Sequence, residues 1–410
     1  MKEFIKKHPS LSKIIAVFLF IIVEILLWNK AINMFKGIGT AKTDGFYYID
    51  TKGHMINSKG FLDEGSPFNE DGVAYAKGVP TSGKINGIDG FINKKGKVIR
   101  QAGITNFQIE GAFSFPIIIT GSEKMEIVDK KLKAIKSKNH EYNYMMQCHS
   151  DFSNGPCLVD SGTGLLGYMN ENLEWVIGPK FLTAGVFTED KIAAVKDPAT
   201  GLYGYIDTDG KYISDERFYR ASAFSDGYAL VQKEKDGGAA YINTKCEYIT
   251  DFVFDYSLSQ KGFSEGMAYV KFNDKLNFGY INEKGETVVE PKYHEVGSFS
   301  HGLAPVKYGH YSFIDKNGNV VIKNLFNWAG SFSKDGYAAV IMDGKYGIID
   351  TNGDWLFEPQ FAIERPMKWE DGFENMEPST GFDVSAPDFQ NGYCMVCLEK
   401  GQRVKRAKRK

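Results

Sequence analysis

Residues 278–307 have the sequence FGYINEKGETVVEPKYHEVGSFSHGLAPVK, and this stretch decides the fold. Asn282–Gly285 has the pattern of a type I turn that a left-handed glycine closes. An aromatic-Gly-aromatic-Ile segment precedes this turn and Val288-Val289 follows it, so strand-forming residues flank the turn on both sides. Phe299–Gly302 then introduces a third apolar segment, Leu303–Lys307. The stretch therefore predicts about three antiparallel strands.

The same unit recurs along most of the chain, which is the feature to look for first in a sequence of this length. Its aromatic-Ile-Asp/Asn motif recurs with a mean period of about 37 residues. The acid or amide stands at Asp50, Asn93, Asp129, Asn170, Asp207, Asn243, Asn282, Asp315 and Asp350. A Phe-Ser-x-Gly motif interleaves with it at Phe152, Phe224, Phe263 and Phe299, in longer form at Phe68 and Phe332, and without the Ser at Phe389. We expect an all-β array of nine three-stranded units over residues 45–398, and the recurring turns account for many of the 44 glycines.

Two details of the unit give local expectations. Leu132, Leu173 and Cys246 stand where other units carry the turn glycine. A Pro-x-aromatic triplet follows the second strand in several units, as in Pro291-Lys292-Tyr293. Because proline cannot donate to a β ladder, we expect the triplet to mark the point where that strand leaves its sheet.

The repeat resembles the bacterial WG-repeat (KWG) family. The best copies are Phe278–Lys307 and Tyr346–Phe361, although Tyr203, Phe278 and Tyr346 stand where the family has its namesake tryptophan. The resemblance implies an all-β repeat domain, often of an exported bacterial protein, and it transfers no catalytic residue because the motif is structural.

The array can close into a propeller-like ring or remain an open β-solenoid. It begins with the first two strands of a unit, Phe46–Ile56, and ends with a lone third strand, Tyr393–Leu398. In a ring, the last strand completes the first sheet and no sheet edge remains exposed. In a solenoid, less regular segments cap the two ends.

The N-terminal segment has the composition of a membrane anchor. Residues 11–35 are predominantly apolar and long enough to span a bilayer as a helix, with Glu24 inside the stretch and Lys13 and Lys30 near its ends. A cleaved secretory signal and a buried helix of the folded domain are the alternatives. Lysines before the stretch slightly outnumber those just after it, which predicts a cytoplasmic segment 1–10, a linker 36–44 and an extracytoplasmic array.

The sequence offers no catalytic, cofactor-binding or metal-binding motif. Asp207–Gly210 superficially suggests a calcium loop, but the EF-hand spacing would place ligands at Tyr205 and Glu216, so we expect a turn. Cys394 and Cys397 should point to opposite faces of one strand, whereas Cys148 and Cys157 could form a disulfide in an exported domain. We expect His294, His301 and His310 to be surface residues. We therefore expect no enzyme activity, no cofactor and no metal.

The two ends of the chain differ in charge from the array. Residues 45–398 carry 12 more acidic than basic side chains, whereas the C-terminal segment 399–410 carries seven basic residues and one acid. Its composition is typical of a disordered tail that attracts an anionic lipid or a cell-wall polymer, or that only aids solubility. The absence of interleaved aromatics makes nucleic acid an improbable partner.

These features predict a single-pass membrane protein that acts as a binding or scaffold module for a protein or an envelope polymer. The alternative is a carbohydrate-active enzyme, or an accessory to one, in the cell envelope, with Trp328 and Trp369 as candidate sugar-stacking residues. A cytoplasmic scaffold is the third possibility, if the membrane orientation is reversed.

Overall fold

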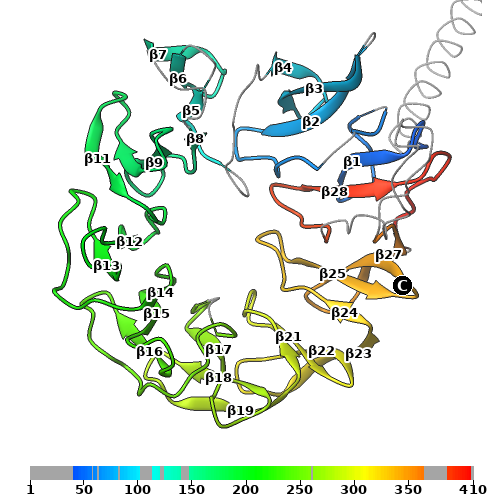
Figure 1. Ribbon diagram of the computed structural model, residues 1–410. Helices are drawn as coiled ribbons and strands as arrows, with labels where there is room; N and C mark the ends of the chain where they lie inside the picture. Colours follow the sequence, from blue (N-terminus) through cyan, green and yellow to red (C-terminus); the bar gives the residue numbers. More distant parts are fainter. Residues whose placement is uncertain are drawn as a thin grey trace, which may run out of the picture.

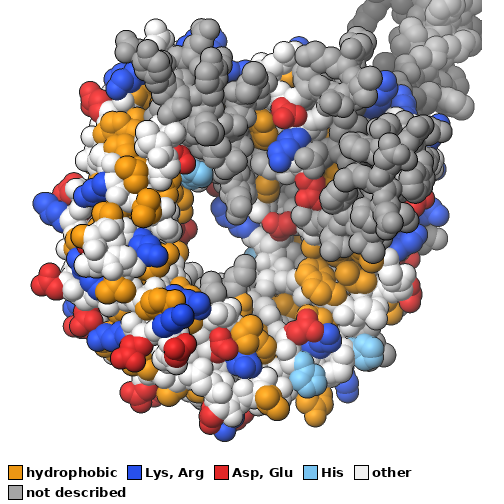
Figure 2. All heavy atoms as spheres, in the orientation of Figure 1, with side chains coloured by type: hydrophobic (Ala, Val, Ile, Leu, Met, Phe, Trp, Pro, Cys, Tyr) orange, Lys and Arg blue, Asp and Glu red, His pale blue; other side chains and the backbone are white. Residues whose placement is uncertain are grey.

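The computed structural model describes residues 40–57, 59–61, 64–81, 84–101, 113–120, 124–139, 147–259, 262–363 and 386–407. In this part of the chain the strands form nine antiparallel sheets, and these sheets surround a central opening (Figures 1 and 2). The described residues contain no helix, and so none that is long and apolar enough to cross a membrane. The predicted anchor, residues 11–35, lies outside them.

The sheets follow one another along the chain. The first pairs β1 (Gly45–Asp50) with β28 (Tyr393–Leu398). The next three are β2 (Val73–Thr81), β3 (Lys84–Asn93) and β4 (Val98–Gln101); β5 (Ile117–Thr120), β6 (Lys124–Val128) and β7 (Ala134–Asn139); and β8 (Gln147–Cys148), β9 (Cys157–Asp160), β10 (Leu166–Met169) and β11 (Trp175–Phe181). Then come β12 (Ala193–Lys196) and β13 (Tyr203–Ile206), followed by β14 (Arg220–Ala221), β15 (Tyr228–Gln232) and β16 (Ala239–Asn243).

The last three sheets are the most regular. They are β17 (Met267–Lys271), β18 (Phe278–Asn282) and β19 (Thr287–Tyr293); β20 (Glu295–Val296), β21 (Ala304–Tyr308), β22 (His310–Ile314) and β23 (Val320–Phe326); and β24 (Trp328–Ala329), β25 (Tyr337–Met342), β26 (Lys345–Asp350) and β27 (Trp355–Phe361). In Figure 1, β17 lies nearest the central opening, β18 lies next and β19 lies outside. Where a sheet lacks a regular outer strand, isolated bridges such as Tyr203 to Phe218 take its place.

The ring is closed by the two ends of the array. β1 and β28 pair antiparallel over six residues, from Gly45 opposite Leu398 to Asp50 opposite Tyr393. The ring prediction is therefore confirmed, and the open solenoid is wrong. Sheet-to-sheet packing also continues through the closure. A Cβ on Gly353 would meet Ile322 of the preceding sheet, and one on Gly53 would likewise meet Phe357.

The Asp-x-x-Gly turns have the expected geometry. At Asp207 the carboxylate accepts backbone hydrogen bonds from Asp209 at 3.0 Å and Lys211 at 2.9 Å, and Gly210 closes the turn with a φ of +81°. Leu132, Leu173 and Cys246 adopt the same left-handed conformation, with φ between 58° and 61°. Left-handed backbone is unfavourable for such residues, but their side chains are buried in the cores, so packing offsets the strain.

The prediction that the Pro-x-aromatic triplet ends the second strand is wrong. β11, β19 and β27 run through the proline to the aromatic residue, so that Phe278 pairs with Tyr293. A bulge between the two pairing registers accommodates the proline, and the strand is the outer one, where a missing N–H is tolerated. The bulge brings the outer backbone against the middle strand: a Cβ on Gly279 would lie 2.5 Å from the Val289 carbonyl oxygen. The glycine after the first aromatic residue of the repeat is therefore required by space.

Most units are organised around the second aromatic residue of the middle strand, whereas Ile127 and Ile348 take its place in the units of β6 and β26. The Tyr205 ring lies 4.8 Å from that of Phe224 and 6.1 Å from that of Phe218, and its buried hydroxyl donates to the Ser222 carbonyl at 2.9 Å. The same hydroxyl-to-carbonyl bond joins Tyr48 to Ser66, Tyr168 to Gly185, Tyr241 to Ser259 and Tyr280 to Gly297. Phe313 keeps both ring contacts, to Phe326 and Phe332, without a hydroxyl.

The Phe-Ser-x-Gly motifs at Phe224, Phe263 and Phe299 form two-residue hairpin turns that link neighbouring sheets. Ser225 and Tyr228 exchange both backbone hydrogen bonds, and the two residues between them have φ of +49° and +83°, as in a type I′ turn. The Ser225 hydroxyl donates to the Phe263 carbonyl in the next turn at 2.7 Å. Glu265, in the same turn as Phe263, accepts from the backbone nitrogens of His301 and Gly302 in the turn that follows.

We expect Gly279→Ala to lower the free energy of unfolding by about 1–3 kcal/mol, because the added methyl group overlaps the outer strand. Gly178→Ala is the matched control. A Cβ at that position meets nothing within 4 Å, so the change should stay within about 0.5 kcal/mol. Chemical denaturation measures both values, and equal effects would contradict the close-approach explanation.

We expect Tyr205→Phe to lower the free energy of unfolding by about 1 kcal/mol, since it removes a buried hydrogen bond and keeps the ring contacts. The reciprocal Phe313→Tyr should be neutral or stabilising, because its hydroxyl would occupy the position that reaches a carbonyl in the other units. Thermal and denaturant unfolding test both variants. A neutral Tyr205→Phe would show that the hydroxyl contributes nothing.

Candidate binding surfaces

The five cysteines are free thiols, and all five are buried. Cys394 and Cys397 lie in two different core clusters, as expected for residues on opposite faces of β28. Cys148 and Cys157 lie in one cluster, and each Sγ donates to the Ser150 carbonyl oxygen at 3.0 Å. Burial raises the pKa of the Cys157 thiol and that of Cys394. These cysteines act as small core residues in this structure, without a disulfide.

The remaining candidates from the sequence lie apart from one another. Tyr205 is buried and faces away from the Asp207 turn, so these residues do not form a calcium loop. His294, His301 and His310 are exposed, as expected, and His301 contacts the Ser333 carbonyl. No group of three potential metal ligands converges anywhere in the described residues.

The two tryptophans proposed for sugar stacking have different outcomes. Trp328 packs against two core clusters, with its ring 6.0 Å from that of Tyr346. Its packing role in the core therefore explains its presence without a sugar. Trp369 lies outside the described residues.

The C-terminal segment is not a disordered tail over residues 399–407, so that expectation is wrong. Val404 is buried in the core cluster shared by β1, β27 and β28. Gln402 and Ala41 are joined by a backbone hydrogen bond of 2.9 Å, and Arg403 forms a β bridge with Thr40. The segment therefore packs beside the point where the chain enters the ring. We call residues 40–44 and 399–407, together with β1 and β28, the seam.

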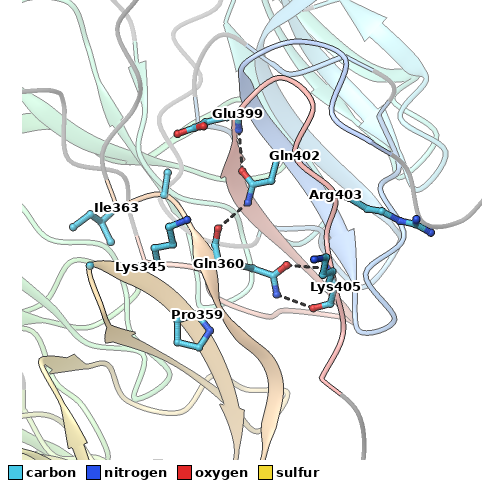
Figure 3. Close-up of a pocket in the computed structure, with 10 residues that line it drawn as sticks. Lys345, Pro359, Gln360, Ile363, Glu399, Gln402, Arg403 and Lys405 are labelled. Atoms are coloured by element: carbon cyan, nitrogen blue, oxygen red, sulfur yellow. Dashed lines mark hydrogen bonds between the residues drawn. The ribbon is translucent and has the colours of Figure 1, made fainter.

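A pocket of about 570 Å³ lies at the seam, between β27 and the C-terminal segment. Figure 3 shows how Gln360 holds this segment: its amide oxygen accepts from the Lys405 backbone nitrogen at 2.8 Å and its amide nitrogen donates to the Lys405 carbonyl at 2.7 Å. Gln402 donates to the Gln360 carbonyl at 2.7 Å. Lys345 and Glu399 lie on one side of the segment, whereas Arg403 points away from them (Figure 3). The pocket charges therefore do not converge on one ligand.

A second surface carries exposed and half-buried aromatic and charged side chains in mutual contact. We call Tyr212, Glu216, Arg217, Lys233, Tyr248 and Phe252 the aromatic patch. The Arg217 guanidinium lies 3.8 Å from the Tyr212 ring centroid, and the Tyr248 and Phe252 rings are 5.1 Å apart.

Glu216 contacts both aromatic pairs of the patch, since its backbone carbonyl accepts from the Arg217 guanidinium at 3.0 Å. Its carboxylate lies 3.1 Å from the Lys233 ammonium and accepts from the Tyr248 hydroxyl at 3.4 Å. Tyr248 and Phe252 remain more than a third exposed. The patch spans the sheets of β12–β13 and β14–β16, and Figure 1 places these sheets across the ring from β1 and β28.

Comparison with protein families identifies the repeat. The family described as "WG containing repeat" matches six consecutive segments, 167–197, 203–235, 240–275, 278–309, 311–346 and 346–362. These segments are WG-containing repeats. The predicted resemblance is thereby confirmed, and the WG repeats comprise the ring from β10 to β27. β1–β9 and β28 continue the same plan outside the matched segments.

Comparison with curated proteins gave no match. Among solved structures, the ring is similar to BamB from Moraxella catarrhalis, with 12% identity, a TM-score of 0.35 and coverage of 71% of this chain and 94% of the other. It is also similar to a eukaryotic initiation factor, with 10% identity, a TM-score of 0.49 and coverage of 77% and 95%. The ring architecture is established by the strand pairing described above, independently of these similarities.

The sequence did not reveal either surface. The aromatic patch combines residues of neighbouring repeats, and Glu216 and Lys233 belong to no repeat motif. Val404 and Ala41, which hold the seam, are single apolar residues in polar surroundings.

We expect the folded protein to present no described cysteine to a thiol reagent at neutral pH, since all five are buried and thiolates are the reactive form. Complete unfolding should then expose five reactive thiols. Mass-resolved alkylation before and after denaturation counts them. Three reactive thiols, with Cys148 and Cys157 missing, would mean that this pair is oxidised.

Proposed function

We propose that this protein is a membrane-anchored, extracytoplasmic and non-catalytic binding module, whose ring of WG repeats holds a protein partner at the aromatic patch. The observation that carries the proposal is the network formed by Tyr212, Arg217, Glu216, Lys233 and Tyr248, in which Glu216, Lys233 and Tyr248 are exposed beside the half-buried Tyr212 and Arg217. Tyr212 also packs against the core of its sheet, whereas Glu216, Lys233 and Tyr248 extend the network to the surface.

The composition of the patch favours a protein over a polysaccharide. Tyrosine and arginine are enriched among the residues that dominate binding energy at protein interfaces. Side chains already held by neighbours lose less conformational freedom on binding, so a pre-ordered surface binds more tightly. Lys233 and Glu216 also provide charges of both signs, which suit a partner with polar and charged side chains.

The anchor and its orientation are supported by the apolar stretch 11–35 and by the distribution of lysines around it. An anchor at the N-terminus would attach the ring at the seam, and the sheets that carry the aromatic patch lie across the ring from β1 and β28 (Figure 1). The patch would then face away from the attachment point, where a partner has access.

A carbohydrate-binding role is favoured by a different residue. Tyr308 is 72% exposed, and its ring stacks on that of His294 with centroids 5.9 Å apart. An exposed aromatic face of this kind can support a sugar ring. This surface is the alternative for an envelope polymer or for an accessory role beside a carbohydrate-active enzyme.

Two measurements test the proposal. Protease added to intact cells should degrade residues 45–410, as it does in permeabilised cells; protection confined to intact cells would overturn the extracytoplasmic location. A photoreactive residue at Phe252 should crosslink one discrete protein in the native membrane, and the same residue at the exposed Val320 should not.

The crosslink should fall about tenfold or more when Arg217 and Tyr248 are both changed to Ala, as expected for central interface residues. The matched control is Val320→Ala with Val321→Ala. If the double patch variant retains the crosslink, or if glycan binding that depends on Tyr308 is found instead, the protein-binding proposal fails.

A further inference from the structure

Five exposed cations surround the point where the chain enters the ring. They are Lys42, Lys400, Arg403, Lys405 and Arg406, and we call them the seam cations. None of them forms an ion pair with another residue in the described part of the chain. Their charges are therefore available to a partner outside the ring.

The backbone around these cations is fixed. Gly401 donates to the Ala41 carbonyl at 2.8 Å, Lys400 donates to the Asp44 carboxylate at 2.7 Å, and Lys405 is held by Gln360. Val404 between them is buried, which leaves Arg403 and Lys405 on the surface. The contacts of the seam thus fix the positions of these cations. Their charge is opposite to that of the array, because residues 45–398 carry 12 more acidic than basic side chains.

The position of the seam relative to the predicted anchor restricts the partner. Thr40, which bridges to Arg403, follows the end of the apolar stretch at Phe35 by five residues. Five extended residues span at most about 18 Å. If residues 11–35 span the membrane, the seam cations therefore lie within reach of the headgroup region.

We infer that the seam cations bind the anionic phospholipid headgroups of the membrane in which the chain is anchored, and so hold the ring at a defined orientation on that surface. The inference rests on the anchor of the proposed function. Clustered Lys and Arg beside a membrane segment are attracted to anionic lipid over a distance of about one Debye length, roughly 8 Å at physiological salt. The acidic remainder of the ring is repelled by the same surface, which reinforces the orientation.

The test uses the full-length chain in nanodiscs of phosphatidylcholine alone or mixed equally with phosphatidylglycerol. A benzophenone amino acid replaces Glu399 at the seam or, as the matched control, Glu234 in the link between β15 and β16; both are exposed acids. Mass spectrometry then counts lipid adducts. We expect adducts at position 399 that depend on phosphatidylglycerol, and few at position 234.

Charge variants distinguish adducts that arise from electrostatic attraction to the lipid from adducts that arise only because position 399 lies near the membrane. In the position-399 protein, Arg403→Gln, Lys405→Gln and Arg406→Gln together should lower the adduct about tenfold or more, as should 1 M salt. The exposed turn residues Lys131, Lys245 and Lys284, changed to Gln together, should leave it unchanged. Equal adducts with and without phosphatidylglycerol, or an adduct that survives the seam variant, would overturn the inference.

Failure of the anchor gives a different result. Alkaline carbonate should leave the protein in native membranes, and its release would show that residues 11–35 do not anchor it. The seam can then still be judged with phosphatidylglycerol vesicles. Salt-sensitive adducts at position 399 would support the inferred contact with headgroups, and the absence of such adducts would overturn it.

Discussion

The pairing of β1 with β28 is the constraint on which the rest of the structure depends. Each sheet of the ring buries its faces against two neighbours, so an open array would expose one face at each end. The seam removes both exposed faces by building one sheet from the two ends of the array. Tyr47 and Ile49 of β1 then pack with Phe357 and Cys394 in a single core cluster. Closure also pairs β1 with a strand more than 340 residues later in the chain, so the two ends of the array lie together at the seam.

Within the ring, the repeat tolerates sequence change because it requires shape more than identity. At the position of Tyr205 the middle strand accepts Phe313, which keeps the same ring contacts, and two other units carry the buried Ile127 and Ile348 there. The preceding glycine is less replaceable, since the bulged outer strand occupies the space of its side chain. The left-handed turn position accepts Leu132 or Cys246 because the preceding sheet offers a site for the side chain.

Most of the fold was predictable because the same turn and strand motifs recur nine times along the chain. The turns at Asp207 and Asp350 follow from local motifs, and the phase of the array made closure through Tyr393–Leu398 one of two alternatives. The proline bulge was not predictable. The missing N–H of Pro291 indicates that the strand ends there, and only the sheet order shows that this strand is an outer one, where a missing N–H is tolerated. The surfaces were not predictable either. Glu216 and Tyr248 are 32 residues apart and belong to different repeats, so no local pattern connects them.

The C-terminal segment shows why composition misled at the seam. Its cations dominate the sequence signal, and such runs usually remain solvated. Ordering requires only a few specific contacts when the neighbouring surface is already fixed, and Gln360, Val404 and Ala41 supply them. The ring therefore has two different sides, one with the aromatic patch and the other with the basic seam. If one side faces a membrane, the other must face away from it. The two proposed contacts are therefore mutually consistent, since neither requires the ring to turn.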